Sequence, residues 1–163
     1  IDPQKNELYK LKAKLGPDAL SNDFNTRYLQ RSLRHRSISI KSALLNQQIV
    51  GGVGNIYASE ALFRAKIPPT MESKKVAKNK IKTDDLISSI KFILSDAIQV
   101  GGSTIRNHKN MEGKSGYFQY KFNVYNRENM ECNSENCSSK IKKIVQTGRS
   151  TFYCDKCQKM RSR

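Results

Sequence analysis

Four cysteines close to the C-terminus constrain this chain more than any other feature of its sequence. They form two pairs, Cys132 with Cys137 and Cys154 with Cys157, separated by a stretch of hairpin length. Two thiol pairs at such a separation suit a tetrahedral metal ion, and zinc is the usual one. A disulfide framework is the alternative, but nothing indicates export and the cysteines are gathered in one short segment. We therefore predict one structural zinc ion, with these four cysteines as its ligands.

The charge of the chain points to a polyanionic partner. Its 163 residues include 30 Lys and Arg against 14 Asp and Glu, a net charge of +16. A net charge of about 2–8 is enough to keep a small domain in solution, so solubility alone explains the excess poorly. Nucleic acid is the favoured partner, and an anionic membrane surface is the lesser option. Arg149, between the cysteine pairs, is placed to grip a phosphate with two hydrogen bonds.

No segment is long and apolar enough to cross a bilayer, and the polar N-terminus does not resemble a signal peptide. We therefore expect a cytoplasmic protein. The first methionine is Met71. For that reason we expect a fragment or a processed chain.

Hydrophobic periodicity predicts a mainly helical domain before the cysteines. The expected elements, in chain order, are a helix capped by Ser21 and running through Leu33, a helix over 40–48, a helix after the glycines at 51–54, a solvated linker over 74–82, a helix capped by Thr83 and ended by Gly101-Gly102, a mobile loop over 103–116, and a strand over 117–125.

Three glycines precede the strongest helical pattern, at positions 51, 52 and 54. A helix that opens in this way exposes unpaired backbone N–H groups at its positive end, where a phosphate binds readily. Asn55 stands at that start and is expected to reach the same phosphate or to cap the helix. A tight turn that needs glycine for steric reasons explains the pattern equally well. No strand precedes it, so it is not a dinucleotide-binding motif.

These motifs occur in an order that resembles the bacterial formamidopyrimidine-DNA glycosylases, over nearly everything after residue 15. The resemblance implies a helix-two-turns-helix domain followed by a zinc-bound β-hairpin, hence a mainly α fold with a small β part. The long loop that ends in Gly116-Tyr117-Phe118 favours this branch over the endonuclease VIII branch. The motifs are Ile40-Lys41-Ser42-Ala43-Leu44-Leu45-Asn46-Gln47, Gly54-Asn55-Ile56-Tyr57-Ala58-Ser59-Glu60, Gly101-Gly102-Ser103-Thr104-Ile105-Arg106, Gly113-Lys114-Ser115-Gly116-Tyr117-Phe118, Val124-Tyr125-Asn126-Arg127 and Gly148-Arg149-Ser150-Thr151-Phe152-Tyr153-Cys154.

The resemblance also implies roles for single residues. Asn55 and Arg149 match the phosphate grips around a flipped nucleotide, and Arg149 matches the proton donor of the second, δ-elimination step. Lys41 matches a lysine near the lesion, and Tyr125 matches a phosphate-contacting tyrosine. Arg106, with the loop over 103–117, matches the segment that closes over the everted base.

Three positions depart from the family pattern. The first cysteine pair encloses four residues where the family usually has two. A basic DNA contact falls on Ser37, so we expect the neighbouring Arg36 to serve instead. Asn107-His108 replaces an acidic and an aromatic residue, which makes an altered lesion preference the expectation.

The activity that the resemblance implies is removal of oxidised purines (8-oxoguanine and formamidopyrimidines) from duplex DNA, followed by strand cleavage. The family attacks with an N-terminal proline amine, whereas this chain opens Ile1-Asp2-Pro3 and Pro3 has no free amine. We therefore expect residues 1–16 to be a linker remnant after a missing catalytic domain, 17–115 the helix-two-turns-helix domain and 116–163 the zinc finger. The expected chain is a monomer that binds DNA with oxidised bases or abasic sites and does not catalyse alone.

Two alternatives come from other functional classes. One is a non-enzymatic, zinc-containing nucleic-acid-binding protein of ribosomal type, because helix-two-turns-helix units also occur there. The other is a zinc-stabilised protein-interaction module, which leaves the net charge of +16 unexplained.

Overall fold

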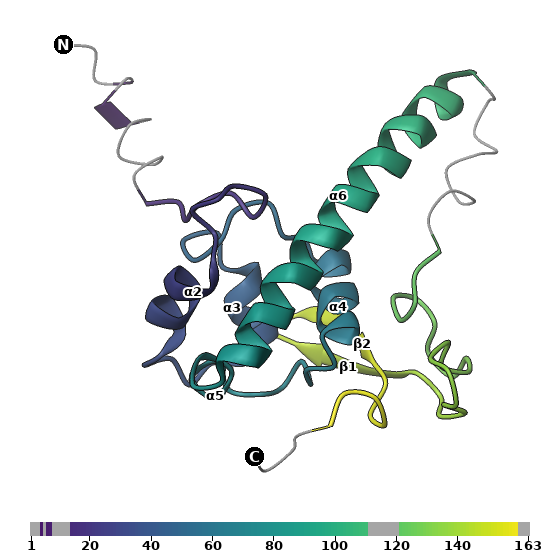
Figure 1. Ribbon diagram of the computed structural model, residues 1–163. Coiled ribbons are helices and arrows are strands. Elements are labelled where there is room, and N and C mark those ends of the chain that lie inside the picture. The colour runs from purple at the N-terminus through teal and green to yellow at the C-terminus, as the bar shows by residue number, and fades with distance from the viewer. Residues whose placement is uncertain (1–3, 5, 8–13, 111–120, 160–163) are drawn as a thin grey trace.

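The computed structural model describes residues 4, 6–7, 14–110 and 121–159, and for residues 101–110 it describes the backbone alone. The chain forms a helical domain with a β-hairpin lying beside it (Figure 1). This arrangement confirms the predicted mainly α fold with a small β part. Its elements are α2 (Thr26–Leu33), α3 (Ile40–Leu45), α4 (Asn55–Arg64), α5 (Ser73–Ala77), α6 (Lys80–Asn110), β1 (Lys142–Gln146) and β2 (Arg149–Tyr153).

The main core belongs to the helical domain alone. Helix α6 packs against α4 and α2, and the long ribbon of α6 extends past the rest of the domain (Figure 1). Its predicted apolar face is confirmed, because Leu86, Ile90, Ile93, Leu94 and Ala97 are all buried. A second, smaller core joins the end of α4 to the cysteine module. Its buried members are Phe63, Val124, Cys132, Ile141, Phe152 and Cys154.

The prediction that Ser21 caps the first helix is wrong. The Ser21 hydroxyl donates to Asp18 O (2.8 Å), so this residue closes a turn. Helix α2 starts later and is capped by Asn25, whose side-chain oxygen accepts from Tyr28 N (2.9 Å). The helix predicted over 40–48 is also shorter, because Asn46 turns to an extended backbone after Leu45.

The prediction of a linker over 74–82, followed by a helix capped at Thr83, is also wrong. Helix α5 occupies the start of that segment and buries Val76 and Ala77. Helix α6 then begins at Lys80, after Asn79, whose side-chain oxygen accepts from Lys82 N (3.0 Å). Thr83 lies inside the helix and donates to Val76 O (2.9 Å). A buried threonine that bonds backward to the preceding turn cannot serve as an N-cap.

The predicted helix end at Gly101-Gly102 is wrong as well, since the α6 backbone stays helical to Asn110 and includes the start of the predicted loop over 103–116. A glycine inside a helix costs about 1 kcal/mol, which is too little to end a helix by itself. The strand predicted over 117–125 is not formed by residues 121–125, and residues 117–120 lie outside the described ranges.

The two strands form an antiparallel pair in which Gln146 stands opposite Arg149. The two turn residues, Thr147 (φ 47°) and Gly148 (φ 76°), both have left-handed backbones. Two such residues in succession are typical of the tight hairpin turn whose twist matches that of the strands. The predicted hairpin between the cysteine pairs is confirmed.

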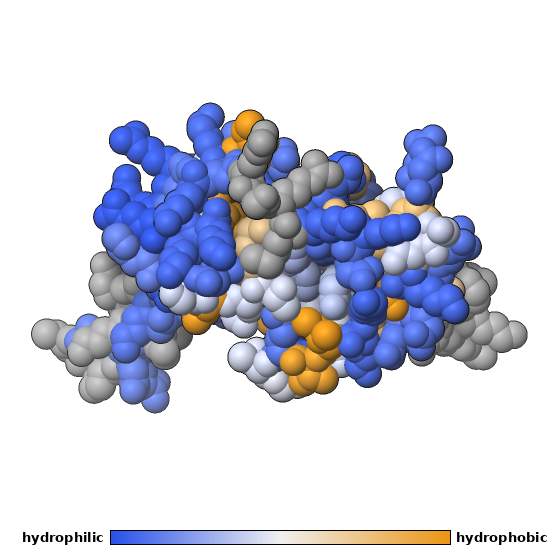
Figure 2. Space-filling view, turned by 90° about the horizontal axis from the view of Figure 1, so that it is seen from below, coloured by the Kyte–Doolittle hydropathy of each residue, from blue (hydrophilic) through white to orange (hydrophobic). Residues whose placement is uncertain are grey.

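The surface is mostly polar. Among the described residues, eight large hydrophobic ones are exposed, distributed along the chain from Leu15 to Val145. Figure 2 shows one face on which hydrophilic side chains predominate and hydrophobic ones form small spots. Among the described residues, every helix is too short or too polar to traverse a lipid bilayer.

Candidate metal centre and nucleic-acid interface

The four cysteine thiols meet at one point beside the hairpin. Their sulfur atoms all lie within 4.8 Å of one another, with Cys132 Sγ 3.8 Å from Cys157 Sγ and Cys137 Sγ 3.8 Å from Cys154 Sγ. Cys132 and Cys154 are buried, and the other two are half-buried. Four sulfur ligands at mutual distances of this size form the tetrahedral donor set that structural zinc prefers.

The first cysteine pair reaches this geometry although it encloses four residues, Asn133 to Asn136. The extra residues are taken up in a turn in which Cys137 N donates to Ser134 O (3.1 Å) and Asn136 has a left-handed backbone (φ 62°). Cys132 N donates to Ser139 O (2.8 Å) and closes the loop. Asparagine tolerates this backbone better than most residues, so the insertion does not displace the thiol.

A buried glutamine fixes the cysteine module to the helical domain. Gln158 Nε2 donates to Ile67 O (2.9 Å), just beyond α4, and Gln158 Oε1 accepts from Cys154 N (2.8 Å). Gln146 Nε2 makes a second, longer contact to Pro69 O (3.3 Å). This role of Gln158 was not predicted from the sequence. Its position next to a cysteine pair was the one available signal.

Glu60 makes the other connection between α4 and the cysteine module. This carboxylate is 1% exposed and accepts hydrogen bonds from Asn123 N and from Val124 N (2.9 Å for the latter). Burial raises the pKa of Glu60, although the backbone N–H groups act in the opposite direction. This role of Glu60 was not predicted from the sequence, because its partners lie more than sixty positions further along the chain.

The start of α4 is open, as the glycine pattern predicts. Gly54 is the N-cap, with an extended backbone, and within the described part of the chain no side chain caps this end. Asn55 does not cap its own helix. Its side-chain Nδ2 instead donates to Ser150 O (3.0 Å) on strand β2. The first N–H groups of α4 therefore have no side-chain acceptor, which leaves a positive helix end beside the hairpin.

Lys41 lies at the junction of α3, α4 and β2. Only 1% of it is exposed, and its ammonium group donates to Asn55 Oδ1 (2.6 Å), Thr151 Oγ1 (2.6 Å) and Ser150 O (3.2 Å). Three donated bonds use all the protons that an ammonium carries. Burial, followed by the nearby charge of Arg149, lowers the pKa of Lys41 to about 8. A direct contact of Lys41 with DNA stays a prediction.

Arg149 is exposed at the first position of β2, directly after the tight turn. Its charge acts on Lys41, and its neighbour Ser150 is bonded to both Lys41 and Asn55. The structure thus brings together three of the predicted site residues, Lys41, Asn55 and Arg149. The hairpin presents an exposed guanidinium next to the open start of α4.

The other predicted site residues lie elsewhere. Tyr125 is half-buried in the smaller core and packs edge-on against Phe152, with ring centroids 5.2 Å apart. Arg36 is exposed after α2, where its Nε donates to Ser32 O (3.0 Å). The backbone of Arg106 belongs to α6, and its side chain lies outside the described part of the structure. Their predicted DNA contacts remain predictions.

Two known family models match this chain, one over the helical domain and one over the cysteine module. The family model described as the formamidopyrimidine-DNA glycosylase H2TH domain matches residues 15–109, more than half of the chain. The chain belongs to the formamidopyrimidine-DNA glycosylase H2TH family. A second model, described as a zinc finger found in FPG and IleRS, matches residues 135–159.

The relatives of this H2TH chain carry the same family name. It is 46% identical over 153 residues to the formamidopyrimidine-DNA glycosylase of Roseobacter denitrificans, covering 94% of this chain and 53% of the relative. It is 42% identical to that of a Ruegeria species, covering 98% of this chain and 56% of the relative. The chain spans about half the length of the curated relatives it matches.

Solved structures agree with this H2TH assignment. A complex of Lactococcus lactis Fpg with DNA containing an abasic site has a TM-score of 0.77 at 34% identity, covering 98% of this chain and 57% of that one. A mutant of the same protein, in complex with DNA containing Fapy-dG, has a TM-score of 0.80 at 35% identity, with the same coverage. The MutM (Fpg) protein of Thermus thermophilus has a TM-score of 0.76 at 34% identity, covering 91% and 55%.

The family match and the thiol geometry together make the cysteine centre a site for one structural zinc ion. Three of the thiols lie inside the matched zinc-finger segment, residues 135–159, and Cys132 lies just before it. The geometry therefore supplies the fourth ligand of the H2TH protein's zinc site. Bound zinc would replace a core that is too small to hold the hairpin by itself.

Proposed function

We propose that this chain is the DNA-binding half of a base-excision-repair DNA glycosylase and AP lyase that removes oxidised purines. Its relatives are named formamidopyrimidine-DNA glycosylase, and the solved complexes contain DNA with an abasic site or Fapy-dG. The partner of this chain is then double-stranded DNA that contains an oxidised base or an abasic site. The non-enzymatic, ribosomal-type alternative is not favoured by these matches.

One structural observation carries the proposal. Asn55, at the open start of α4, is bonded to the backbone of Ser150, the residue that directly follows the exposed Arg149. A phosphate placed between them meets a guanidinium, a side-chain amide and the positive end of a helix. Each of these groups favours an anion, and together they form a phosphate grip that is independent of base sequence.

The further site residues complete the proposed interface. Arg149 is proposed to donate the proton of the δ-elimination step in the whole enzyme, besides holding phosphate. Lys41 is proposed to hold Asn55 and strand β2 in position beside the lesion. Tyr125, Arg106 and Arg36 are proposed to contact DNA around this centre.

Catalysis by the whole enzyme needs a covalent nucleophile, which the family takes from an N-terminal proline amine. In the polypeptide Ile1–Arg163, Pro3 is preceded by two residues and its nitrogen is acylated. We expect this polypeptide to bind a duplex that contains 8-oxoguanine without forming a covalent intermediate. Borohydride trapping tests this, since a trapped protein–DNA adduct would refute it. A higher affinity for structured RNA than for duplex DNA would refute the repair function itself.

The remaining proposals concern organisation. We propose a monomer that works beside the bacterial nucleoid in the cytoplasm. Residues 1–16 are proposed as a connecting segment, 17–115 as the DNA-binding helical domain and 116–163 as the zinc finger. Sedimentation of the zinc-bound chain, alone and with one equivalent of duplex, tests the monomer. A dimer in either sample would contradict it.

A further inference from the structure

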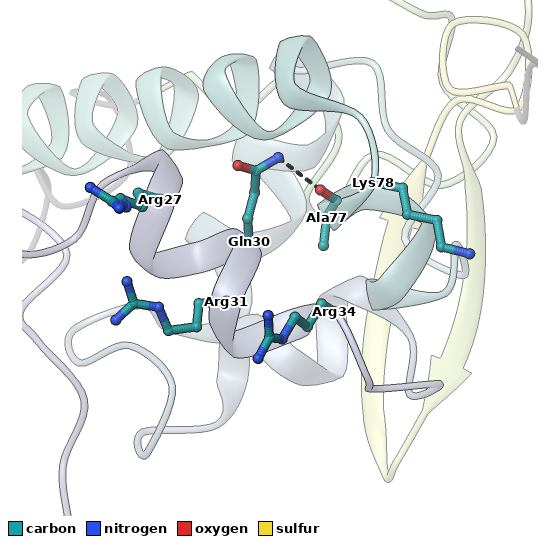
Figure 3. Close-up of a pocket in the computed structure, with 6 residues that line it drawn as sticks. All are labelled: Arg27, Gln30, Arg31, Arg34, Ala77 and Lys78. Atoms are coloured by element: carbon teal, nitrogen blue, oxygen red, sulfur yellow. Dashed lines mark hydrogen bonds between the residues drawn. The ribbon is translucent and has the colours of Figure 1, made fainter.

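A second basic surface lies on α2 and at the end of α5. Arg27 and Arg31 lie in α2, and Arg34 is its C-cap, with a helical backbone. The spacing i, i+4, i+7 places the three arginines on one face. Lys78 follows the last residue of α5. Together with Gln30 and Ala77, these four basic residues line a cavity of about 320 Å³ (Figure 3).

The helices that carry this basic surface are held in place. Gln30 Nε2 donates to Ala77 O (2.9 Å), which ties α2 to α5 across the cavity (Figure 3). The opposite face of α2 buries Leu29 and Leu33 in the main core. The backbone positions of the basic residues are therefore fixed, while their side chains extend into solvent.

The four cations of this surface have no acidic partners in the described part of the chain. Neighbouring lysines are paired: Lys74 and Lys75 with Glu72, and Lys80 with Asp84. By contrast, Arg27, Arg31, Arg34 and Lys78 form no ion pair and no side-chain hydrogen bond with any described residue. No carboxylate of the described residues lines the cavity. Four like charges on one surface repel each other unless an anion lies between them.

We infer that this α2–α5 surface is a second contact for the DNA backbone, reached by duplex beyond the segment held at Arg149. The inference rests on the proposed function, in which the chain binds duplex DNA. The three arginines extend over roughly 10 Å of helix axis, which is comparable to about three base-pair steps of rise along one strand. Phosphates bind such a row without any apolar anchor.

An acidic peptide is the other ligand that cations attract, and the cavity suits it less well. Peptide recognition depends on buried apolar or aromatic anchors, and the apolar lining here is Ala77 alone.

The α2–α5 surface is also separate from the hairpin in the fold. Helix α2 packs against α5 and α6, whereas β2 packs against α4. A duplex that ends near Arg149 would leave α2 uncovered.

The test compares two duplexes that contain the same abasic-site analogue, one of about one helical turn and one of about three turns. Arg27, Arg31 and Arg34 are changed to Gln together, and binding is followed as a function of salt concentration. On the long duplex, the slope of log K against log salt should fall by about 2.7, which is three phosphate contacts. On the short duplex, the slope should not change. Lys66→Gln, at an exposed position outside both surfaces, is the matched control and should leave both slopes nearly unchanged.

Three results would overturn the inference. The slope could fall equally on both duplexes, which would make α2 part of the Arg149 site, or it could fall on neither. Alternatively, poly-glutamate could displace the long duplex from the wild type but not from the triple variant, which would indicate a site for acidic peptides. Arg149→Ala on the short duplex reports on the proposed function separately, so the two failures are distinguishable. Far-UV circular dichroism should confirm that the triple variant is folded, because all three side chains are exposed.

Discussion

The ammonium nitrogen of Lys41 lies 2.6 Å from Asn55 Oδ1. This bond fixes the Asn55 amide so that its Nδ2 faces the backbone of Ser150 on β2. A buried cation in the helical domain thereby positions a side chain that we propose to bind DNA. The same ammonium bonds Thr151, so Lys41 also holds the strand that carries Arg149.

This geometry predicts that Lys41 acts on DNA through Asn55. Lys41→Met and Asn55→Ala should each weaken binding of the abasic-site duplex, and the double variant should lose less than the sum. The expected coupling is about 0.5–3 kcal/mol, as for residues in direct contact. Lys41→Met combined with Lys66→Gln is the control pair and should be additive. Additive losses for Lys41 and Asn55 would instead indicate two independent phosphate contacts.

The pH dependence of binding should report the same lysine. Burial and the charge of Arg149 lower the pKa of Lys41 to about 8, and a phosphate bound beside it raises that pKa again. DNA binding near pH 8 should therefore take up protons, and affinity should fall as the pH rises through 8. Calorimetry in buffers of different ionisation enthalpy measures the uptake, which should be absent in Lys41→Met. Persistent uptake in that variant would assign it to another group.

The same pKa has the opposite consequence for folding. The folded-state pKa, about 8, lies below the unfolded value of 10.5, so the unfolded chain binds more protons between these pH values. The contribution of Lys41 to stability should therefore increase as the pH rises through that window. Comparing the free energy of unfolding of wild type and Lys41→Met across it isolates this contribution.

Arg149 should supply one phosphate contact. Arg149→Ala should weaken DNA binding and lower the salt slope by about one counterion. Arg149→Lys is the matched control, because it keeps the charge and removes the two-pronged geometry. It should preserve the salt slope and still lose affinity. An unchanged slope in Arg149→Ala would show that this residue contacts no phosphate.

Cys132 should be as necessary for zinc as Cys154, although the family's zinc-finger match begins after Cys132. Cys132→Ser and Cys154→Ser should both release zinc and unfold the hairpin. The helices should remain folded, because the main core takes its residues from positions up to Leu94 and none from the hairpin. Zinc content and amide hydrogen exchange measure the two effects. Ser138→Ala, at an exposed position, is the control, and one zinc per chain in Cys132→Ser would exclude that ligand.

Glu60 should stabilise the contact between α4 and the cysteine module. In Glu60→Gln an amide NH₂ must face Asn123 N–H or Val124 N–H in place of an accepting oxygen. The free energy of unfolding should fall by about 1–3 kcal/mol, the cost of an unsatisfied buried group. The exposed Glu128→Gln should change it by less than about 0.5 kcal/mol. Equal stability of the two variants would show that the Glu60 bonds are not maintained in solution.

Much of the fold follows from local patterns in the sequence. The spacing of the thiols predicted the metal hairpin, and the apolar period over 86–97 predicted the buried face of α6. The glycines before Asn55 predicted an open helix start. Helix ends were predicted less well, because Ser21 and Thr83 look like caps until their hydroxyls find other carbonyls.

The sequence by itself determined which groups the chain can offer: four thiols, an arginine on a hairpin and a helix that starts directly after glycines. Only the tertiary structure decided how they meet. Lys41 is bonded to residues 14 and 110 positions away, and Asn55 to one 95 positions away. No local pattern encodes such pairs, because the residues on either side of a lysine do not show whether the folded chain will bury it. The packing of α3, α4 and β2 buries Lys41. An unpaired buried charge is costly, so the ammonium group bonds to Asn55, Ser150 and Thr151.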